Sequence, residues 1–135
     1  MTIFHDFLKS HRLGVVSTTG PDGPQAALVG IAVTADLKLI FDTVESTRKF
    51  ANLMRNPACA VVAGWEGEQT LQYEGTAERV GSHADNPVLA PYFAAWPDGI
   101  ERLGWAGIAH FVITPKWLRF SDFGQTPPRI ETWRP

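Results

Sequence analysis

Short apolar segments alternate with turns that contain glycine and proline, and this alternation restricts the possible folds more than any other feature. Residues 13–19 read L-G-V-V-S-T-T and residues 25–34 read Q-A-A-L-V-G-I-A-V-T, with G-P-D-G-P between them. Proline and glycine preset the backbone angles of tight turns, and β-branched residues favour strands. The two segments are therefore predicted to form a hairpin.

Further segments of the same kind predict a mainly β protein. They lie at residues 38–43, 58–65, 69–80, 107–114 and 116–123. Helices are expected only at residues 2–10 and 45–57, together with a broken helical excursion over residues 83–103 that packs on the sheet or on a partner subunit. Six or seven antiparallel strands with so few helices predict a closed or nearly closed barrel, because closure removes exposed sheet edges.

Length and charge narrow the functional classes. A chain of 135 residues predicts one domain over residues 1–135, and its net charge of −2 argues against broad binding to nucleic acid. The single cysteine, Cys59, lies in the run A-C-A-V-V-A and is expected to be a buried hydrophobe in a reducing compartment. No segment approaches the roughly 18 apolar residues of a membrane span, so a cytoplasmic location is expected.

One segment carries the main functional signal, E-S-T-R-K-F-A-N-L-M-R-N-P at residues 45–57. With Ser46 as the N-cap, Phe50, Leu53 and Met54 share a buried face, and Arg48 and Lys49 fall in the first turn. Cations at that end of a helix are unfavourable by about 0.3–1 kcal/mol each, because the free N–H groups and the dipole are already positive there. A bound phosphate reverses this cost, so the segment predicts a phosphate site.

Two other interpretations of this segment remain open from the sequence. Asp42 and Glu45 could neutralise both cations. A helix that begins at Asp42 or Thr43 would move Arg48 into the second turn, where the dipole matters less.

The order of these segments resembles the pyridoxamine 5'-phosphate oxidase-like family of FMN-binding split barrels. The likeness rests on F-D-T, then S-T-R-K-F-A-N-L-M-R-N-P, then A-C-A-V-V-A, then Y-E-G-T-A-E-R-V, and it continues through P-Y-F-A-A-W-P-D-G and H-F-V-I-T-P-K-W-L-R-F-S-D-F. It covers nearly the whole chain and is closest to the small bacterial-type members. The resemblance implies a six- to seven-stranded antiparallel split β-barrel with flanking short helices. It also implies a homodimer with FMN at the subunit interface, part of each site coming from the partner chain.

The resemblance assigns the FMN phosphate to Thr47, Arg48 and Lys49, with Ser46 beside them, and gives Thr43 a contact with the flavin. Thr70 aligns with a glutamine that the oxidase uses on a later strand. Small side chains that permit close approach favour the backbone from Ala27 to Gly30 for the ring edge. Aromatic character near the expected interface suggests stacking by Trp105. The full set of candidate cofactor-binding residues is Ala27, Leu28, Val29, Gly30, Thr43, Ser46, Thr47, Arg48, Lys49, Thr70 and Trp105.

Departures from the family pattern limit the inferred activity. Ala27 and Ala32 stand where the oxidase has an arginine and a lysine, and T-P-P-R-I-E-T-W replaces its basic C-terminal substrate motif. The resemblance therefore implies FMN as the cofactor more directly than it implies pyridoxamine 5'-phosphate as the substrate.

The leading hypothesis is an FMN-dependent oxidoreductase acting on a small, unidentified substrate. Alternatives are a non-catalytic flavin- or ligand-binding module and a deazaflavin-dependent reductase of the same fold. His110, within I-A-H-F-V-I, is expected to be a hydrogen-bonded structural residue. No metal site is expected, because His83 and Asp85 lack a second ligand cluster at suitable spacing.

Overall fold

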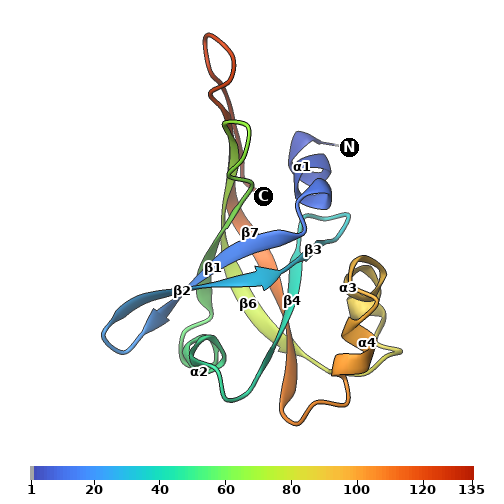
Figure 1. The fold of residues 1–135 in the computed structure, drawn as a ribbon. Helices are drawn as coiled ribbons and strands as arrows, with labels where there is room; N and C mark the ends of the chain where they lie inside the picture. The colour runs from blue at the N-terminus through green and yellow to red at the C-terminus, as the bar shows by residue number, and fades with distance from the viewer. Residues whose placement is uncertain (1) are drawn as a thin grey trace.

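The computed structural model describes residues 2–135, and its main element is one curled antiparallel sheet (Figure 1). Neighbouring strands follow the order β2-β1-β5-β6-β7-β4-β3, and β8 pairs with β7. The strands are β1 (Leu13–Gly20), β2 (Gly23–Gly30), β3 (Ala32–Val33), β4 (Leu39–Val44), β5 (Ala58–Ala63), β6 (Gln69–Val80), β7 (Ile108–Asp122) and β8 (Arg129–Trp133). The predicted mainly β split barrel is confirmed, with β2 and β3 as the two edge strands.

Three strand predictions are wrong in detail. Residues 107–114 and 116–123 were expected to form two strands separated at Pro115, yet β7 runs through this proline without a break. The register between β6 and β7 shifts between Glu74 and Gly75, opposite the stretch from Pro115 to Trp117. A β-bulge accommodates a residue that lacks an N–H donor, so proline is tolerated there. No strand was predicted in the tail, but residues 129–133 form β8. The strand predicted over residues 25–34 is divided into β2, which pairs with β1, and β3, which pairs with β4.

The inner face of the sheet holds the main core. Its largest fully buried side chains include Phe41, Phe111, Leu118 and Tyr73, whose hydroxyl lies 2.7 Å from the carbonyl oxygen of Leu37. Helix α1 (Ile3–Ser10) covers one end of this core with Phe4, Phe7 and Leu8. Burial of these side chains supplies the hydrophobic stabilisation that closes the barrel.

The predicted helical excursion packs on the outer face of β3, β4 and β7 (Figure 1). It consists of η1 (Pro87–Leu89), α3 (Ala90–Ala95) and α4 (Gly99–Arg102). Leu89 and Tyr92 bury themselves against Ala32, Ile40 and Val112 of the sheet. No helix within residues 2–135 is long and apolar enough to cross a bilayer.

A polar cluster fastens the excursion to β4. Arg102 donates from Nε to Asp42 Oδ2 at 2.7 Å, from Nη1 to Asp98 Oδ2 at 2.6 Å and from Nη2 to Tyr92 Oη at 2.8 Å. The side chains of Arg102 and Asp42 are only 16% and 15% exposed. Burial raises the pKa of the Tyr92 hydroxyl, so it stays protonated and neutral beside this ion pair.

His110 lies beneath the same cluster and is fully buried. Its Nδ1 is 2.7 Å from Ser82 Oγ, which confirms the prediction of a hydrogen-bonded structural histidine. Burial lowers the pKa of His110, with the Asp42 carboxylate opposing and the Arg102 cation adding to this effect. The neutral imidazole is therefore the favoured form in the core.

Candidate functional site

Helix α2 (Arg48–Arg55) begins later than the sequence suggested. Its N-cap is Thr47, not Ser46, and neither Asp42 nor Thr43 begins the helix, because both lie in β4. Arg48 and Lys49 therefore occupy the first two helical positions, where backbone N–H groups lack intrahelical partners. The two cations stand closer to the positive end of the dipole than the sequence interpretation placed them.

The Thr47 hydroxyl is used entirely within the protein. It donates to the carbonyl oxygen of Val44 at 3.0 Å and accepts from the N–H of Phe50 at 3.3 Å. Thr43 Oγ1 lies 2.8 Å away and must be the donor in that pair, because Thr47 has already given its only proton to Val44. Thr43 and Thr47 thus fix the turn that leads into α2.

Asn52 anchors α2 to the first hairpin. Its Nδ2 donates to Thr18 Oγ1 at 3.0 Å and to Gln25 Oε1 at 2.8 Å, and the residue is only 2% exposed. Met54, which was expected on the buried face, is 56% exposed instead. The role of Asn52 was not predicted from the sequence. An asparagine inside a helix is unfavourable unless its side chain has a specific hydrogen-bond partner, so the residue type itself indicates such a partner.

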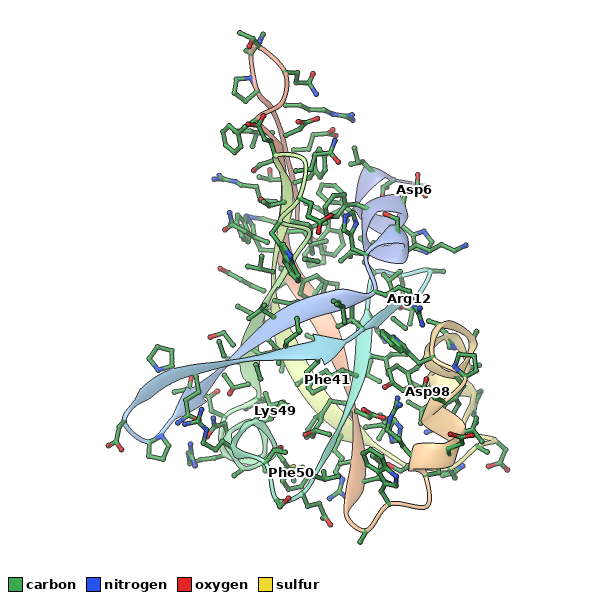
Figure 2. The ribbon with its side chains drawn as sticks, viewed as in Figure 1. Asp6, Arg12, Phe41, Lys49, Phe50 and Asp98 are labelled. Atoms are coloured by element: carbon green, nitrogen blue, oxygen red, sulfur yellow. The ribbon has the colours of Figure 1, made fainter. Side chains whose placement is uncertain are left out.

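A cavity of about 350 Å³ lies between the start of α2 and the hairpin. Figure 2 shows Lys49 on the side of α2 that faces β1 and β2. The structure thus brings Ala27 together with the four residues predicted to bind phosphate. The residues that line the cavity are Val16, Gln25, Ala26, Ala27, Ser46, Thr47, Arg48 and Lys49.

The neighbouring carboxylates are engaged elsewhere, so the interpretation that they neutralise the two cations is wrong. Asp42 pairs with Arg102, and Glu45 lies 3.3 Å from the guanidinium of Arg79. Across residues 2–135, neither Arg48 nor Lys49 forms an ion pair or a side-chain hydrogen bond. The cavity therefore carries uncompensated positive charge at a helix N-terminus.

Burial lowers the pKa of the Lys49 ammonium, and the charge on Asp42 only partly opposes this effect. An anion placed beside Lys49 would favour its charged form and raise the pKa again. The backbone N–H groups of Arg48 and Lys49 also have no hydrogen-bond acceptor in the described part of the chain. Two amides, two cations and the hydroxyl of Ser46 are thus available to one oxyanion.

Strand β2 forms the opposite wall of the cavity and is an edge strand of the sheet. In an edge strand, every second residue has its backbone N–H and C=O groups directed away from the sheet, without a partner strand. Of the stretch predicted to meet the ring, Ala27 lines the cavity, Leu28 is 59% exposed and Val29 is buried in the core. Gly30 has a different role, because a Cβ there would lie 2.7 Å from the ring of Trp96. The indole of Trp96 therefore occupies the space that a side chain at position 30 would need.

The remaining two candidates lie away from the cavity within one chain. Thr70 is near the start of β6 and pairs with Ser121 of β7. Trp105 is 58% exposed in the turn before β7, next to Gly107, whose carbonyl oxygen accepts from the N–H of Glu45 at 2.8 Å. Neither residue lines the cavity at the start of α2.

Comparison with known sequences identifies the family of the chain. A family profile described as pyridoxamine 5'-phosphate oxidase matches residues 4–120. The chain belongs to this family. No curated protein sequence matches it. The family profile includes the first hairpin, helix α2 and most of β7, so every wall of the cavity lies in the shared region.

Solved structures show the same split-barrel fold. General Stress Protein 26 from Bacillus anthracis strain Sterne is 21% identical with a TM-score of 0.72, covering 96% of this chain and 94% of that one. A heme binding protein from Mycobacterium smegmatis is 15% identical with a TM-score of 0.78. The match covers 99% of this chain but only 58% of the heme binding protein. An F420 reductase is 22% identical with a TM-score of 0.68, covering 87% and 97%. At these identities the likeness establishes the fold alone.

Proposed function

We propose that this family member is a cytoplasmic homodimeric FMN-binding oxidoreductase, and that the FMN phosphate occupies the cavity at the start of α2. One observation carries the proposal: Arg48 and Lys49 occupy the first two positions of the helix, beside a cavity and without a carboxylate partner. That arrangement is unfavourable when the cavity holds no anion and favourable when it holds one.

The proposed phosphate ligands differ from those of the family pattern at one residue. Arg48 supplies planar, charge-assisted hydrogen bonds, and Lys49 supplies a compact charge. The N–H groups of both residues and the Ser46 hydroxyl complete the set. Thr47 contributes by capping the helix, because its hydroxyl proton is already donated to Val44.

FMN supplies the redox chemistry when bound, and the protein holds and orients it. The unpaired backbone groups of β2 between Ala27 and Gly30 are the proposed contact for the ring edge. Thr70 lies outside the cavity, so we assign its contribution to a second copy of the chain. Trp105 is proposed to cover the cofactor from the turn beside Glu45.

The proposed dimer uses the outer face of β2, β1 and β5. Leu28 pairs with Val15, and Val15 pairs with Val62, so the three side chains form one row across the strands. Leu28 and Val62 are 59% and 41% exposed. Exposed apolar rows of this kind mark interaction surfaces, and this row continues to the edge strand beside the cavity.

Purification without added cofactor tests the proposal. We expect a yellow protein with twice the 14.9 kDa mass of the chain, whose released ligand has the mass of FMN. Steady turnover with a reductant and an electron acceptor would then distinguish an oxidoreductase from a flavin-storing module. A monomer, or a protein that releases or preferentially binds heme or a deazaflavin, would contradict the proposal.

The affinity for FMN should depend on pH through Lys49. Burial lowers the pKa of Lys49 in the free protein, and a bound phosphate dianion would raise it. FMN binding therefore takes up a proton at pH values between these two pKa values. The affinity for FMN is expected to be constant below the Lys49 pKa of the free protein and to fall as the pH rises through it. Titrations from neutral pH up to the ordinary lysine range should show this fall in the native protein, and Lys49→Gln should remove it. An unchanged profile in the variant would contradict the contact.

A further inference from the structure

A second cavity of about 490 Å³ lies between α1, β3 and α3, away from the start of α2. Its walls include the buried side chains of Leu8, Ile31 and Ala32, and Pro91 and Ala94 of α3 form the opposite side. We call this cavity the α1–α3 groove. Cavities of several hundred cubic ångströms with apolar walls and a few polar groups are typical small-molecule sites.

The titratable side chains that line the α1–α3 groove are all basic: His5, Lys9 and Arg12. Arg12 lies between α1 and α3 (Figure 2). One of its terminal nitrogens donates to the carbonyl oxygen of Ala95, and its guanidinium stacks over Trp96 at 4.0 Å. These contacts hold the arginine in place and leave further N–H donors of the fork free.

The two permanently charged side chains of the groove, Lys9 and Arg12, are not balanced by carboxylates. Within residues 2–135, neither Lys9 nor Arg12 forms an ion pair. His5 Nδ1 is buried without a hydrogen-bond partner, and the oxygen of Asp6 lies 3.9 Å from it, beyond hydrogen-bond distance. The groove thus combines apolar walls with an unneutralised basic rim.

We infer that the α1–α3 groove binds a small amphipathic carboxylate, with its apolar body on Leu8, Ile31 and Ala32 and its carboxylate at Lys9 and Arg12. A planar carboxylate matches the arginine fork, and the apolar walls favour an aliphatic or aromatic body over a small hydrophilic anion. An amine of the same size would meet like charge at the rim.

This inference does not rest on the proposed FMN site. The two cavities share no lining residue: one meets β2 at residues 25–27, and the other meets the chain at residues 31–35. Arg48→Ala is therefore expected to leave carboxylate binding unchanged. Failure of one site can be recognised while the other still binds its ligand.

Isothermal titration calorimetry of the full chain with octanoate tests the inference. Octanoate is expected to bind at one site per chain, whereas acetate lacks the apolar body and octylamine carries the wrong charge, so neither should bind measurably. Lys9→Gln should weaken octanoate binding at least threefold. Ala94→Phe should fill the groove and abolish binding. Lys116→Gln removes a charge from an exposed position of β7 and should leave the affinity unchanged.

Three results would overturn the inference: no heat of binding with octanoate, equal affinity for octanoate and octylamine, or equal affinities in Lys9→Gln and Lys116→Gln. Circular dichroism of each variant confirms that it is folded. Lys9 and Ala94 are both exposed, and the Lys9 pair decides the outcome even if Ala94→Phe does not fold.

Discussion

Replacing Arg48 with alanine is expected to weaken FMN binding by about 1.5–3 kcal/mol, a loss of roughly 10- to 150-fold in affinity. The proposed site places the guanidinium at the first position of α2 with no carboxylate partner, so its hydrogen bonds to phosphate compete with no internal ion pair. Titration of the two apoproteins with FMN, followed by quenching of flavin fluorescence, measures the difference directly.

Two variants make this measurement specific. Arg48→Lys keeps the charge but loses the planar fork, so its loss of affinity should be smaller than that of the alanine variant. Arg134→Ala removes the same charge from the exposed C-terminal end and should bind FMN as the native protein does. Equal affinities for Arg48→Ala and Arg134→Ala would refute the assignment of Arg48 to the phosphate.

Replacing Arg102 with methionine is expected to lower the free energy of unfolding by about 2–4 kcal/mol. Removing one member of a mostly buried ion pair leaves the other charge desolvated and unpaired, and this is more costly than loss of the attraction alone. Arg102 also joins Asp42 of β4 to Tyr92 of α3, so its loss removes a polar link between the excursion and the sheet and leaves the apolar contacts of Leu89 and Tyr92 in place. Urea unfolding of both proteins measures the change.

Asp42→Asn provides the matched control for Arg102→Met. In the double variant no unpaired carboxylate remains, so part of the lost stability should return, and the double-mutant cycle should give a coupling of about 1–3 kcal/mol. If the losses from the two single variants simply add, the Asp42–Arg102 pair does not hold the excursion in place.

Most of the fold could be predicted from local sequence patterns. The turn of the first hairpin and strands β1, β4, β5 and β6 have alternating or continuous apolar residues bounded by turn signals, and all form as expected. The errors have one physical origin, which is tertiary context. Pro115 reads as a break, but the bulge beside Gly75 lets β7 continue, and the polar tail becomes β8 only because β7 offers it an edge.

In the candidate site, too, features set by neighbouring residues could be predicted, whereas features set by distant residues could not. The position of Arg48 and Lys49 at a helix start could be inferred from neighbouring residues. Their lack of carboxylate partners could not, because it depends on Arg102, which is 60 residues beyond Asp42 in the chain. The meeting of Gly30 with Trp96 likewise joins distant segments.

Under the proposed function, positive charge stands at the start of α2 because a cofactor phosphate binds there. A crystal structure of the protein grown with excess FMN would show the position of that phosphate. We expect the phosphate within hydrogen-bond distance of Arg48, Lys49 and their backbone N–H groups, with the ring edge along β2. A phosphate bound elsewhere, with both side chains turned to carboxylates, would contradict it.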